Sequence, residues 1–437
     1  MALPPTTPPP LPSALSGMTA ALLRWQRRLA TFTAGQAGVQ VLAFVNALLV
    51  LRWMGEAEYA KTGVVLGFQT LCTTFVDLGV GGALVALIGR DGVRPAVAGA
   101  YLAAGRWWRR LLFVLVVPPA GAAFVALCLR QGWGLGESLV LLGCIALSLH
   151  AAALTALASA PLLLHHRLGA FYGSANGGAL ARLAGLLLLH QAGLLDAVSA
   201  TALNTAVALG VAWACMRAAR PHVDEPARAP AHERREILRY AAPLAPMAAF
   251  YALQGQVTTV LVATFGEAQH IAEVTALGRL GQLFAFLSAL YSMLVLPYFA
   301  RVPAAAFHRR YPAAVAATLA LAAAIALLAF ALPQPLLWLL GPRYAHLGAE
   351  VGWMVAASAL AFASGALWCI HAARHWVFWS TSVVYVVAVT AVQAAWIAHA
   401  DMGRTHDVVL LAVLANAAAL ACQGWVAGLG LRRDSAA

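Results

Sequence analysis

The chain has 437 residues, of which 62% are hydrophobic and only 10% are charged, and its mean hydropathy is +0.79. A soluble globular domain has roughly 25% charged residues, so this composition excludes the soluble class and indicates that the bilayer is the solvent. The net charge of +12 lies in connections between apolar runs rather than on a folded basic face. That placement argues against nucleic acid as a partner and favours anionic membrane lipids.

The apolar runs are long enough for transmembrane helices. About 20 apolar residues of helix cross the roughly 30 Å of hydrocarbon, and none of the runs alternates in hydrophobicity as barrel strands do. The sequence therefore predicts an all-α polytopic membrane protein of about twelve spans. They are 29–51, 62–89, 111–129, 138–160, 173–194, 197–216, 241–264, 273–298, 313–332, 351–371, 376–398 and 407–429.

The segments outside the spans divide the chain into two lobes. Residues 1–28, which begin with an uncharged proline-rich stretch, are expected to be a disordered cytoplasmic tail rather than a signal peptide. Residues 217–240 form a cytoplasmic linker of mixed charge between six-helix lobes at 29–216 and 241–430, and 431–437 are a second cytoplasmic tail. The six cysteines lie singly in apolar runs, which indicates core residues rather than disulfides or metal ligands.

The basic residues predict the orientation. With the N-terminus inside, the cytoplasmic segments hold 21 of the 28 Lys and Arg residues and the opposite segments hold five. Because loops rich in Lys and Arg stay in the cytoplasm, both termini are expected there. The two remaining basic residues, Arg182 and Arg279, fall within spans.

Matching residues recur in the two halves at offsets of 211, 213 and 207. Each half has an even number of spans, so the halves start on the same side and form a parallel repeat about an axis along the membrane normal. Such a duplication predicts a substrate site between the halves. The matches are Gly55-Glu56-Ala57 with Gly266-Glu267-Ala268, Arg130 and Glu137 with Arg343 and Glu350, and Arg167 and Phe171 with Arg374 and Phe378.

Four local motifs accompany this pattern: Leu51-Arg52-Trp53-Met54-Gly55 through Tyr59, Asp77-Leu78-Gly79, Pro243-Leu244, and Leu339-Leu340-Gly341-Pro342-Arg343-Tyr344. Together they resemble the polysaccharide flippases of the MATE-like superfamily, which move undecaprenyl-diphosphate-linked oligosaccharides across the bacterial inner membrane. The resemblance implies two six-helix lobes around a central, often cationic cavity that opens alternately to either side without ATP. It also implies that spans one, two, seven and eight face the cavity, and that glycan polymerases or export machinery are partners. The chain departs from these proteins in being short, with lean loops.

Charged side chains within spans are the strongest site candidates. Each costs about 2.5 to 3.5 kcal/mol near the bilayer centre and therefore needs a partner or a wet cavity. Arg279 is predicted to bind phosphate, since a guanidinium stays charged and forks onto phosphate oxygens. The alternative is an intramembrane salt bridge or snorkelling. Arg182 shares this chemistry, although its span is expected to lie farther from the cavity. Gln36 and Gln256 are the amides expected to bind sugar hydroxyls.

Asp77 has two interpretations. In the first, Asp77 takes up a proton and couples transport to a proton gradient. In the second, which is favoured, it forms a lasting ion pair with Arg279 or Arg182. The neighbouring glycines, Gly79, Gly81 and Gly82, indicate close helix packing. Residues 92–110, with Trp107 and Trp108, are expected to lie at the headgroup interface.

Other chemistry has little support. His165-His166 have no carboxylate or cysteine within a turn, and the pair His371 and His375 has only Cys369 near it, which is not at ligand spacing, so all four are expected to be structural rather than metal ligands. No phosphate-binding loop, zinc-protease motif or nucleophile elbow occurs, and no cofactor is expected. Two alternatives stay open besides the flippase: a cation-coupled multidrug exporter, and a membrane-embedded glycan polymerase or ligase. Against them stand the lack of an acidic residue in 29–51 and the short external loops.

Overall fold

A computed structural model describes residues 14–91, 94–165, 167–224, 226, 228–242, 245, 249–250, 253–254, 268–302, 304–374, 376 and 379–436. Every regular element in these residues is helical, which confirms the predicted all-α class. Nine of the described helices are long and apolar enough to cross a membrane. The predicted span at 241–264 lies largely outside the described residues.

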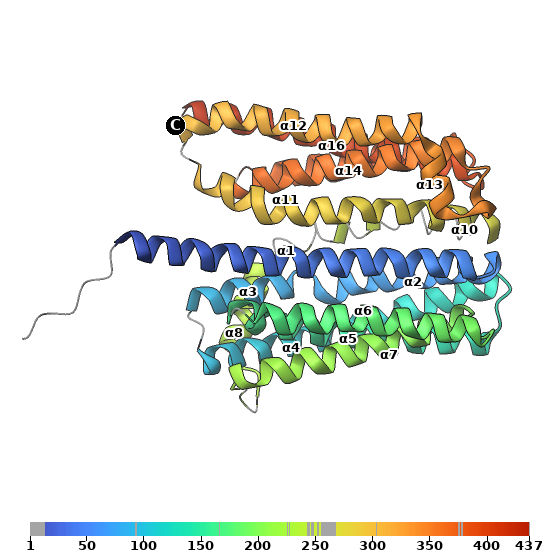
Figure 1. The fold of residues 1–437 in the computed structure, drawn as a ribbon, viewed down its shortest axis with the longest axis horizontal. Helices are drawn as coiled ribbons and strands as arrows, with labels where there is room; N and C mark the ends of the chain where they lie inside the picture. Colours follow the sequence, from blue (N-terminus) through green and yellow to red (C-terminus); the bar gives the residue numbers. More distant parts are fainter. Residues whose placement is uncertain are drawn as a thin grey trace, which may run out of the picture.

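The helices form two groups, one above the other in Figure 1, with α1 between them against α6 and α11. α1 begins and α16 ends at the same end of the molecule, here called the termini end. The lower lobe contains α1 (Ala14–Trp53), α2 (Glu56–Asp77), α3 (Val80–Asp91), α4 (Pro95–Arg130), α5 (Leu135–Leu164), α6 (Leu168–Gln191), α7 (Ala197–Ala219), η1 (Arg220–His222) and α8 (Ala231–Ala241). The upper lobe contains α10 (Ala268–Gly278), η2 (Arg279–Gly281), α11 (Gln282–Arg301), α12 (Ala304–Ala331), α13 (Pro333–Leu340), η3 (Pro342–Tyr344), α14 (Gly348–Ala373), α15 (Trp379–Ile397) and α16 (Thr405–Ala436).

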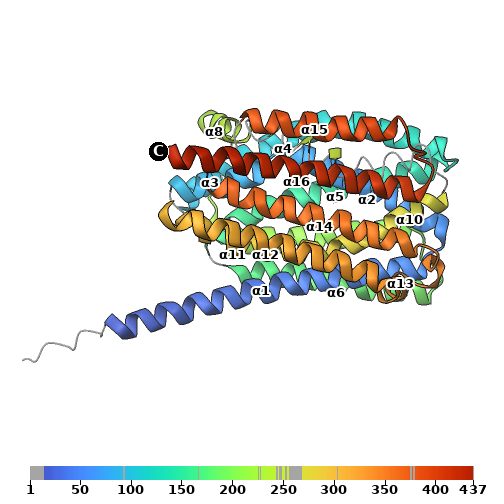
Figure 2. The same ribbon diagram turned by 90° about the horizontal axis from the view of Figure 1, so that it is seen from above.

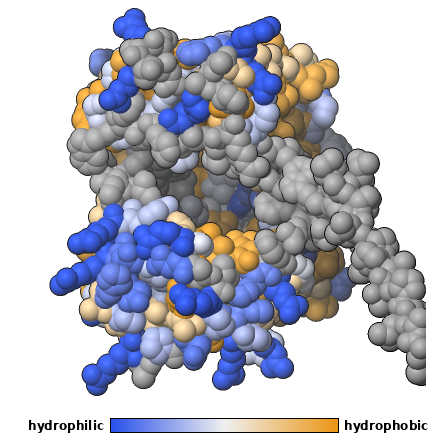
Figure 3. All heavy atoms as spheres, turned by 90° about the vertical axis from the view of Figure 1, so that its left-hand side faces the viewer, coloured by the Kyte–Doolittle hydropathy of each residue, from blue (hydrophilic) through white to orange (hydrophobic). Residues whose placement is uncertain are grey.

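Among the described residues, the apolar core is shared by the lobes at one end only. At the end opposite the termini, here called the closed end, one cluster joins Met54 and Tyr59 of the lower lobe to Tyr344 of the upper lobe. Toward the termini end the cores separate, one around Leu84 and another around Phe307. Figure 3 looks onto the termini end and shows a hollow between the two lobes. The described state is therefore sealed at the closed end and separated at the other. Figure 2, in which the bundle is seen from above, shows α1 projecting beyond the other helices at the termini end.

Two kinds of contact seal the closed end. α2 and α10 approach so closely that a Cβ built on Gly63 would overlap the hydroxyl of Thr275. Arginines also cross the seam in both directions. The Arg52 guanidinium donates to the carbonyls of Trp338 and Leu339, and Arg343 Nη1 donates to the carbonyl of Met54 at 2.8 Å. These carbonyls lie at helix ends, where the backbone lacks intrahelical partners.

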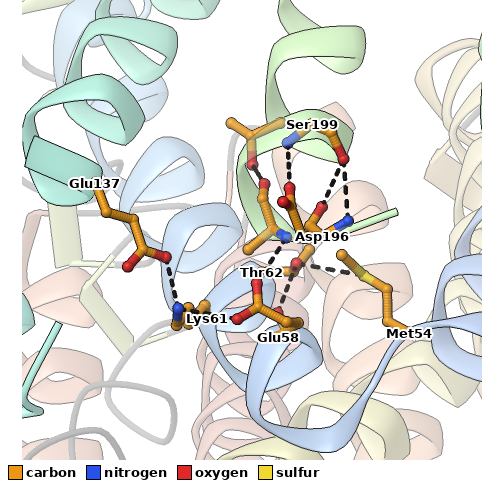
Figure 4. A network of polar contacts seen from close by, with 9 residues as sticks. Met54, Glu58, Lys61, Thr62, Glu137, Asp196 and Ser199 are labelled. Atoms are coloured by element: carbon orange, nitrogen blue, oxygen red, sulfur yellow. Dashed lines mark hydrogen bonds and ion pairs between the residues drawn. The ribbon is translucent and has the colours of Figure 1, made fainter. Parts of the chain in front are cut away.

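The lower lobe is tied together at the closed end by a polar network (Figure 4). Lys61 Nζ lies 2.6 Å from Glu137 Oε1 and 2.9 Å from Glu58 Oε1. Glu58 Oε2 accepts a hydrogen bond from the backbone N–H of Ala197 at 2.9 Å, the first residue of α7. Asp196 caps that helix by accepting from the backbone N–H of Ser199 at 2.7 Å. Because these bonds connect α2, α5 and α7, the three helices are expected to move as one body.

The second span is broken into α2 and α3. α2 ends at Asp77, and Leu78 and Gly79 adopt positive φ angles of 38° and 88°. A positive φ favours glycine, so Gly79 accounts for the break between the two helices. It does not provide the close helix packing that was predicted for this glycine cluster. The eighth span is likewise interrupted, since α10 stops at Gly278 and the three residues of η2 precede α11.

The stretch 92–110, predicted to lie at the headgroup interface, belongs in its described part to one long helix, and its depth in the membrane stays a prediction. From Pro95 onward the stretch is the first part of α4, which runs for 36 residues. Proline at the first turn, after the extended residue Arg94, favours a helix start at this point. Trp107 is 38% exposed, but the Trp108 indole donates to the carbonyl of Arg234 in α8 at 2.9 Å.

The linker helix α8 is bonded to the lower lobe. Its Glu236 accepts hydrogen bonds from the Tyr101 hydroxyl and from Arg90 Nη2, the latter at 2.9 Å. The Tyr101 hydrogen bond and then the Arg90 bond stabilise the carboxylate, so the pKa of Glu236 is held below its usual value. α8 is therefore part of the lower lobe in this state.

Candidate substrate site

A pocket of about 170 Å³ lies on the seam just inside the closed end. α1, α2, α6 and α7 of the lower lobe supply most of its wall, and η2 and α11 of the upper lobe complete it. We call it the seam pocket. It is lined by Ala43, Asn46, Ala47, Val50, Thr62, Val65, Leu66, Gln69, Arg182, Leu186, Ala200, Thr201, Asn204, Arg279 and Gln282.

Both in-span arginines line the seam pocket, one from each lobe. Arg182 comes from the middle of α6, and Arg279 is the first residue of η2. Arg279 Nε donates to the hydroxyl of Tyr59 at 3.3 Å, and Tyr59 is fully buried in the shared core. No carboxylate is among the described residues that line the pocket. The pocket is therefore cationic, and its two charges belong to different halves of the protein.

Four polar atoms in the seam pocket are buried and have no hydrogen-bond partner among the described residues: Asn46 Oδ1, Gln69 Oε1, Arg182 Nε and Gln282 Oε1. A buried polar group without a partner costs about 1 to 3 kcal/mol, so such groups are rare unless water or a ligand binds them. Their concentration at one place indicates a site that is completed by something outside the protein. Three are acceptors, and one is a charged donor.

The size of the seam pocket limits what it holds in this state. A water molecule occupies roughly 30 Å³ of liquid, so 170 Å³ is space for a few waters or one small anionic group. Drug-sized ligands need roughly 300–1,000 Å³. A large ligand would place only its charged group here and extend toward the hollow between the lobes.

Asp77 lies elsewhere and forms an ion pair. Arg109 Nη2 donates to Asp77 Oδ1, and the Arg109 Nη1 donates to the carbonyl of Ala153. The same carboxylate accepts from the backbone N–H of Gly81 at 3.2 Å, in the first turn of α3. The predicted partners, Arg182 and Arg279, are therefore wrong, because α4 is longer than its predicted span and carries Arg109 to the break in the second span.

The two glutamines chosen from the sequence are not in the seam pocket's described wall. Gln36 lies on α1 ten residues before Asn46, about 15 Å away along the helix axis. It is partly buried. Gln256 lies outside the described residues. The amides that do line the pocket are Asn46, Gln69, Asn204 and Gln282.

The histidines fit structural roles where they are described. His371 is fully buried, and its ring nitrogens bond to the Tyr311 hydroxyl at 2.8 Å and to Gln423 Oε1 at 2.9 Å. His165 stacks on His222 with 4.3 Å between the ring centroids. His166 and His375 lie outside the described residues. Within the described part of the chain, no three His, Cys, Asp or Glu side chains gather at a metal-binding distance.

Comparison with known proteins identifies the fold. No family model and no curated protein matches the sequence. An inward-facing multidrug-resistance transporter of the MATE family has a TM-score of 0.66 at 12% identity, over 92% of this chain and 98% of that one. The lipid II flippase MurJ, in an inward closed conformation, has a TM-score of 0.67 at 12% identity, over 90% of this chain and 86% of that one. The fold is that of the MATE-like transporters.

A transporter of the MOP superfamily from Pyrococcus furiosus, described as having a binding pocket of reversed polarity, has a TM-score of 0.64 at 12% identity over 94% of this chain and 96% of that one. These neighbours are transporters and flippases rather than enzymes. The MATE-like fold confirms the two-lobe architecture predicted from the repeat. The wall of the seam pocket contains α1, α2 and the eighth span as expected, but α6 and α7, the fifth and sixth spans, also contribute to it, although less than α1 and α2 do.

Proposed function

We propose that this protein is a flippase that moves undecaprenyl-diphosphate-linked oligosaccharide across the bacterial inner membrane for surface polysaccharide biosynthesis. The observation that carries the proposal is the meeting of Arg182 and Arg279, from opposite lobes, in a pocket whose described wall has no carboxylate. Guanidinium groups fork onto phosphate oxygens and keep their charge in a low dielectric. A diphosphate has enough oxygens to bind both arginines at once.

The geometry suits alternating access. The diphosphate would enter from the termini end, which the positive-inside rule places in the cytoplasm, and bind under the closed end. The unpaired amide oxygens Asn46 Oδ1, Gln69 Oε1 and Gln282 Oε1 would accept hydrogen bonds from sugar hydroxyls or bridging waters. Release to the other side requires the contacts at Gly63, Arg52 and Arg343 to break. The likeness in fold to a lipid II flippase is consistent with this cycle.

The test is reconstitution in liposomes with a fluorescent undecaprenyl-diphosphate-linked saccharide, followed by quenching from outside. We expect flipping by the natural protein and a rate at least tenfold lower for Arg182→Gln with Arg279→Gln, since a hydrogen bond to a charged group contributes about 1.5–3 kcal/mol. Arg130→Gln is the matched control, because Arg130 is exposed and lines none of the pockets described here. Flipping at the natural rate by the double variant would reject the proposal.

In the cell, deletion of the gene should accumulate the lipid-linked glycan on the cytoplasmic face. The polymerase or export machinery that consumes the flipped glycan is the expected partner. Unchanged surface polysaccharide after deletion would count against this role.

A cation-coupled multidrug exporter is the second candidate, favoured by the likeness in fold to MATE multidrug transporters. The cationic seam pocket argues against it, because two guanidinium groups repel cationic drugs. Asp77 does not offset them, as it is bonded to Arg109 and lines a different pocket. Efflux of a cationic dye from loaded vesicles, unaffected by Arg279→Gln, would favour the exporter.

A further inference from the structure

A second basic pocket lies in the lower lobe at the termini end, away from the seam. It has a volume of about 460 Å³ and is enclosed by α4, α5, α7 and η1, with no residue of the upper lobe in its described wall. We call it the lobe pocket. It is lined by Leu102, Arg106, Leu157, Ala158, Trp213, Met216, Arg217, Ala219, Arg220 and Val223.

Arg217 and Arg220 give the lobe pocket a positive charge that no described residue of its wall balances. Three arginines line it, and no carboxylate is among the described lining residues. Arg217 and Arg220 are exposed and form no ion pair within the described part of the chain. The Arg217 guanidinium lies over the Trp213 ring, 5.6 Å from its centroid, which fixes the direction of its stem. The pocket thus presents oriented positive charge toward an anion.

The rest of the wall is apolar and lies near the end of α7. Leu157, Met216 and Val223 form an apolar side next to the arginines. Trp213 is 65% exposed, although it is a large aromatic residue of a spanning helix. It lies six residues before the end of α7, about 9 Å along the axis. Tryptophan is enriched at the level of the membrane where headgroups meet acyl chains.

We infer that the lobe pocket binds an anionic phospholipid of the bilayer, with its phosphate on Arg217 and Arg220 and its acyl chains along the outer face of α7 beside Trp213. A basic pocket between membrane helices on the side rich in arginine has the chemistry for an acidic headgroup. The two arginines stand at the end of α7 and the start of the linker. A bound lipid would therefore connect the sixth span to the segment that leads to the second lobe.

The transported substrate is a poorer occupant than a bilayer lipid. The lobe pocket has no wall from the upper lobe, so its ligand would not be exposed alternately to both sides as the lobes rearrange. The inference is independent of the proposed transport reaction, which depends on the seam pocket.

Lipid binding is measured by native mass spectrometry of the full chain in detergent, with dioleoylphosphatidylglycerol, dioleoylphosphatidylcholine or sn-glycerol 3-phosphate added. We expect phosphatidylglycerol to be retained about tenfold more tightly than phosphatidylcholine. We expect Arg217→Gln with Arg220→Gln to weaken phosphatidylglycerol retention about tenfold, equivalent to about 1.4 kcal/mol. Arg309→Gln with Arg432→Gln is the control, because both arginines are exposed and belong to the other lobe, near the start of α12 and the end of α16.

Thermal unfolding adds a second readout that does not require the variant to have normal stability. Phosphatidylglycerol should raise the melting temperature of the natural protein and the control, but not that of the Arg217 and Arg220 variant, each compared with its own lipid-free sample. Arg220→Lys should give an intermediate shift, because lysine keeps the charge but loses the fork. Equal stabilisation by phosphatidylcholine, or by glycerol 3-phosphate without acyl chains, would overturn the lipid assignment.

Discussion

Tyr59 is the residue that holds Arg279 in place at the seam. Its hydroxyl accepts from Arg279 Nε at 3.3 Å, and its ring is fully buried. We expect Tyr59→Phe to keep the fold and slow flipping by about tenfold, because a hydrogen bond to a charged group contributes about 1.5–3 kcal/mol. The liposome assay measures this. Tyr298→Phe is the control, since Tyr298 accepts from Arg310 at 2.7 Å on the exposed surface. Equal rates for both variants would show that Tyr59 does not position Arg279.

The Asp77 and Arg109 pair is expected to behave as a unit. The Arg109 side chain is 4% exposed, so Asp77→Asn leaves a nearly buried charge without its counter-ion. Such a loss costs about 3–5 kcal/mol, whereas removing both charges is often close to neutral. We therefore expect Asp77→Asn to lower the melting temperature more than Asp77→Asn combined with Arg109→Met does. Additive losses in this double-mutant cycle would mean that the two side chains do not interact.

For individual residues of the seam pocket, the sequence predicted the charged side chains better than the amide side chains that lack a hydrogen-bond partner. Arg182 and Arg279 were found because an arginine within an apolar run is rare. The amides that line the pocket were harder to predict, because most amides within spans bond to neighbouring helices. Asn176, for example, donates to the carbonyl of Gly35 at 3.1 Å. Asn46 bonds similarly through Nδ2 and leaves only Oδ1 free. That difference depends on side-chain geometry, which no spacing in the sequence encodes.

Among the elements, the α2 and α10 contact offers a way to lock the closed end. A Cβ built on Gly63 would lie 3.0 Å from Thr275 Cβ, close to the roughly 3.5–4.5 Å of a disulfide. We expect Gly63→Cys with Thr275→Cys to cross-link under oxidation and to stop flipping, with recovery on reduction. Each single variant is the control. Continued flipping by the fully cross-linked protein would show that the closed end does not have to open.

The attachment of α8 should depend on pH. The pKa of Glu236 is lowered in the folded state, so its bonds stabilise the protein above the ordinary glutamate pKa of about 4.3 and are lost as pH falls below it. We expect Glu236→Gln to lower the melting temperature at pH 7 by about 1–3 °C, with the difference shrinking near pH 4. Thermal unfolding of both proteins at the two pH values measures this. A difference that grows toward pH 4 would contradict the assignment.

Helix positions were predictable because apolar runs of about 20 residues have few alternatives in a membrane. Helix ends and breaks were not. α4 extends to Pro95 because its polar side is covered by α8, as the bond from Trp108 to Arg234 shows. The break at Gly79 was hidden because glycine in a membrane helix indicates close packing as often as a turn.

For the whole molecule, orientation is the prediction most open to test. α1 begins and α16 ends at one end of the bundle, and the distribution of basic residues predicts that this end lies in the cytoplasm. A fluorescent protein that matures only in the cytoplasm should therefore be bright when fused after Ala437. A fusion after Arg130, between α4 and α5, should be dark. The reverse pattern would invert the proposed direction of loading.

The two-lobe architecture followed from the sequence because the offsets between repeated residues are nearly constant. The helices that line the site were predicted only in part, because α1, α2 and the eighth span were expected there and α6 and α7 were not. α6 and α7 reach the seam pocket because α1 packs against α6 through Gly35, where a Cβ would overlap the Tyr172 ring. Only the packed arrangement shows that this close approach brings Arg182 to the seam.

The two spans related by duplication are no longer interrupted at the same height. The break in the lower lobe begins at Leu78, 23 residues after Gly55, and the 3-10 turn of the upper lobe begins at Arg279, 13 residues after Gly266. Of these two interruptions, only the upper one carries a charge that lines the seam pocket. An anion bound there contacts the interruption of one half directly and lies at a distance from that of the other. The duplicated halves would then take unequal shares of the motion, in a transport cycle that is asymmetric within a nearly symmetric frame.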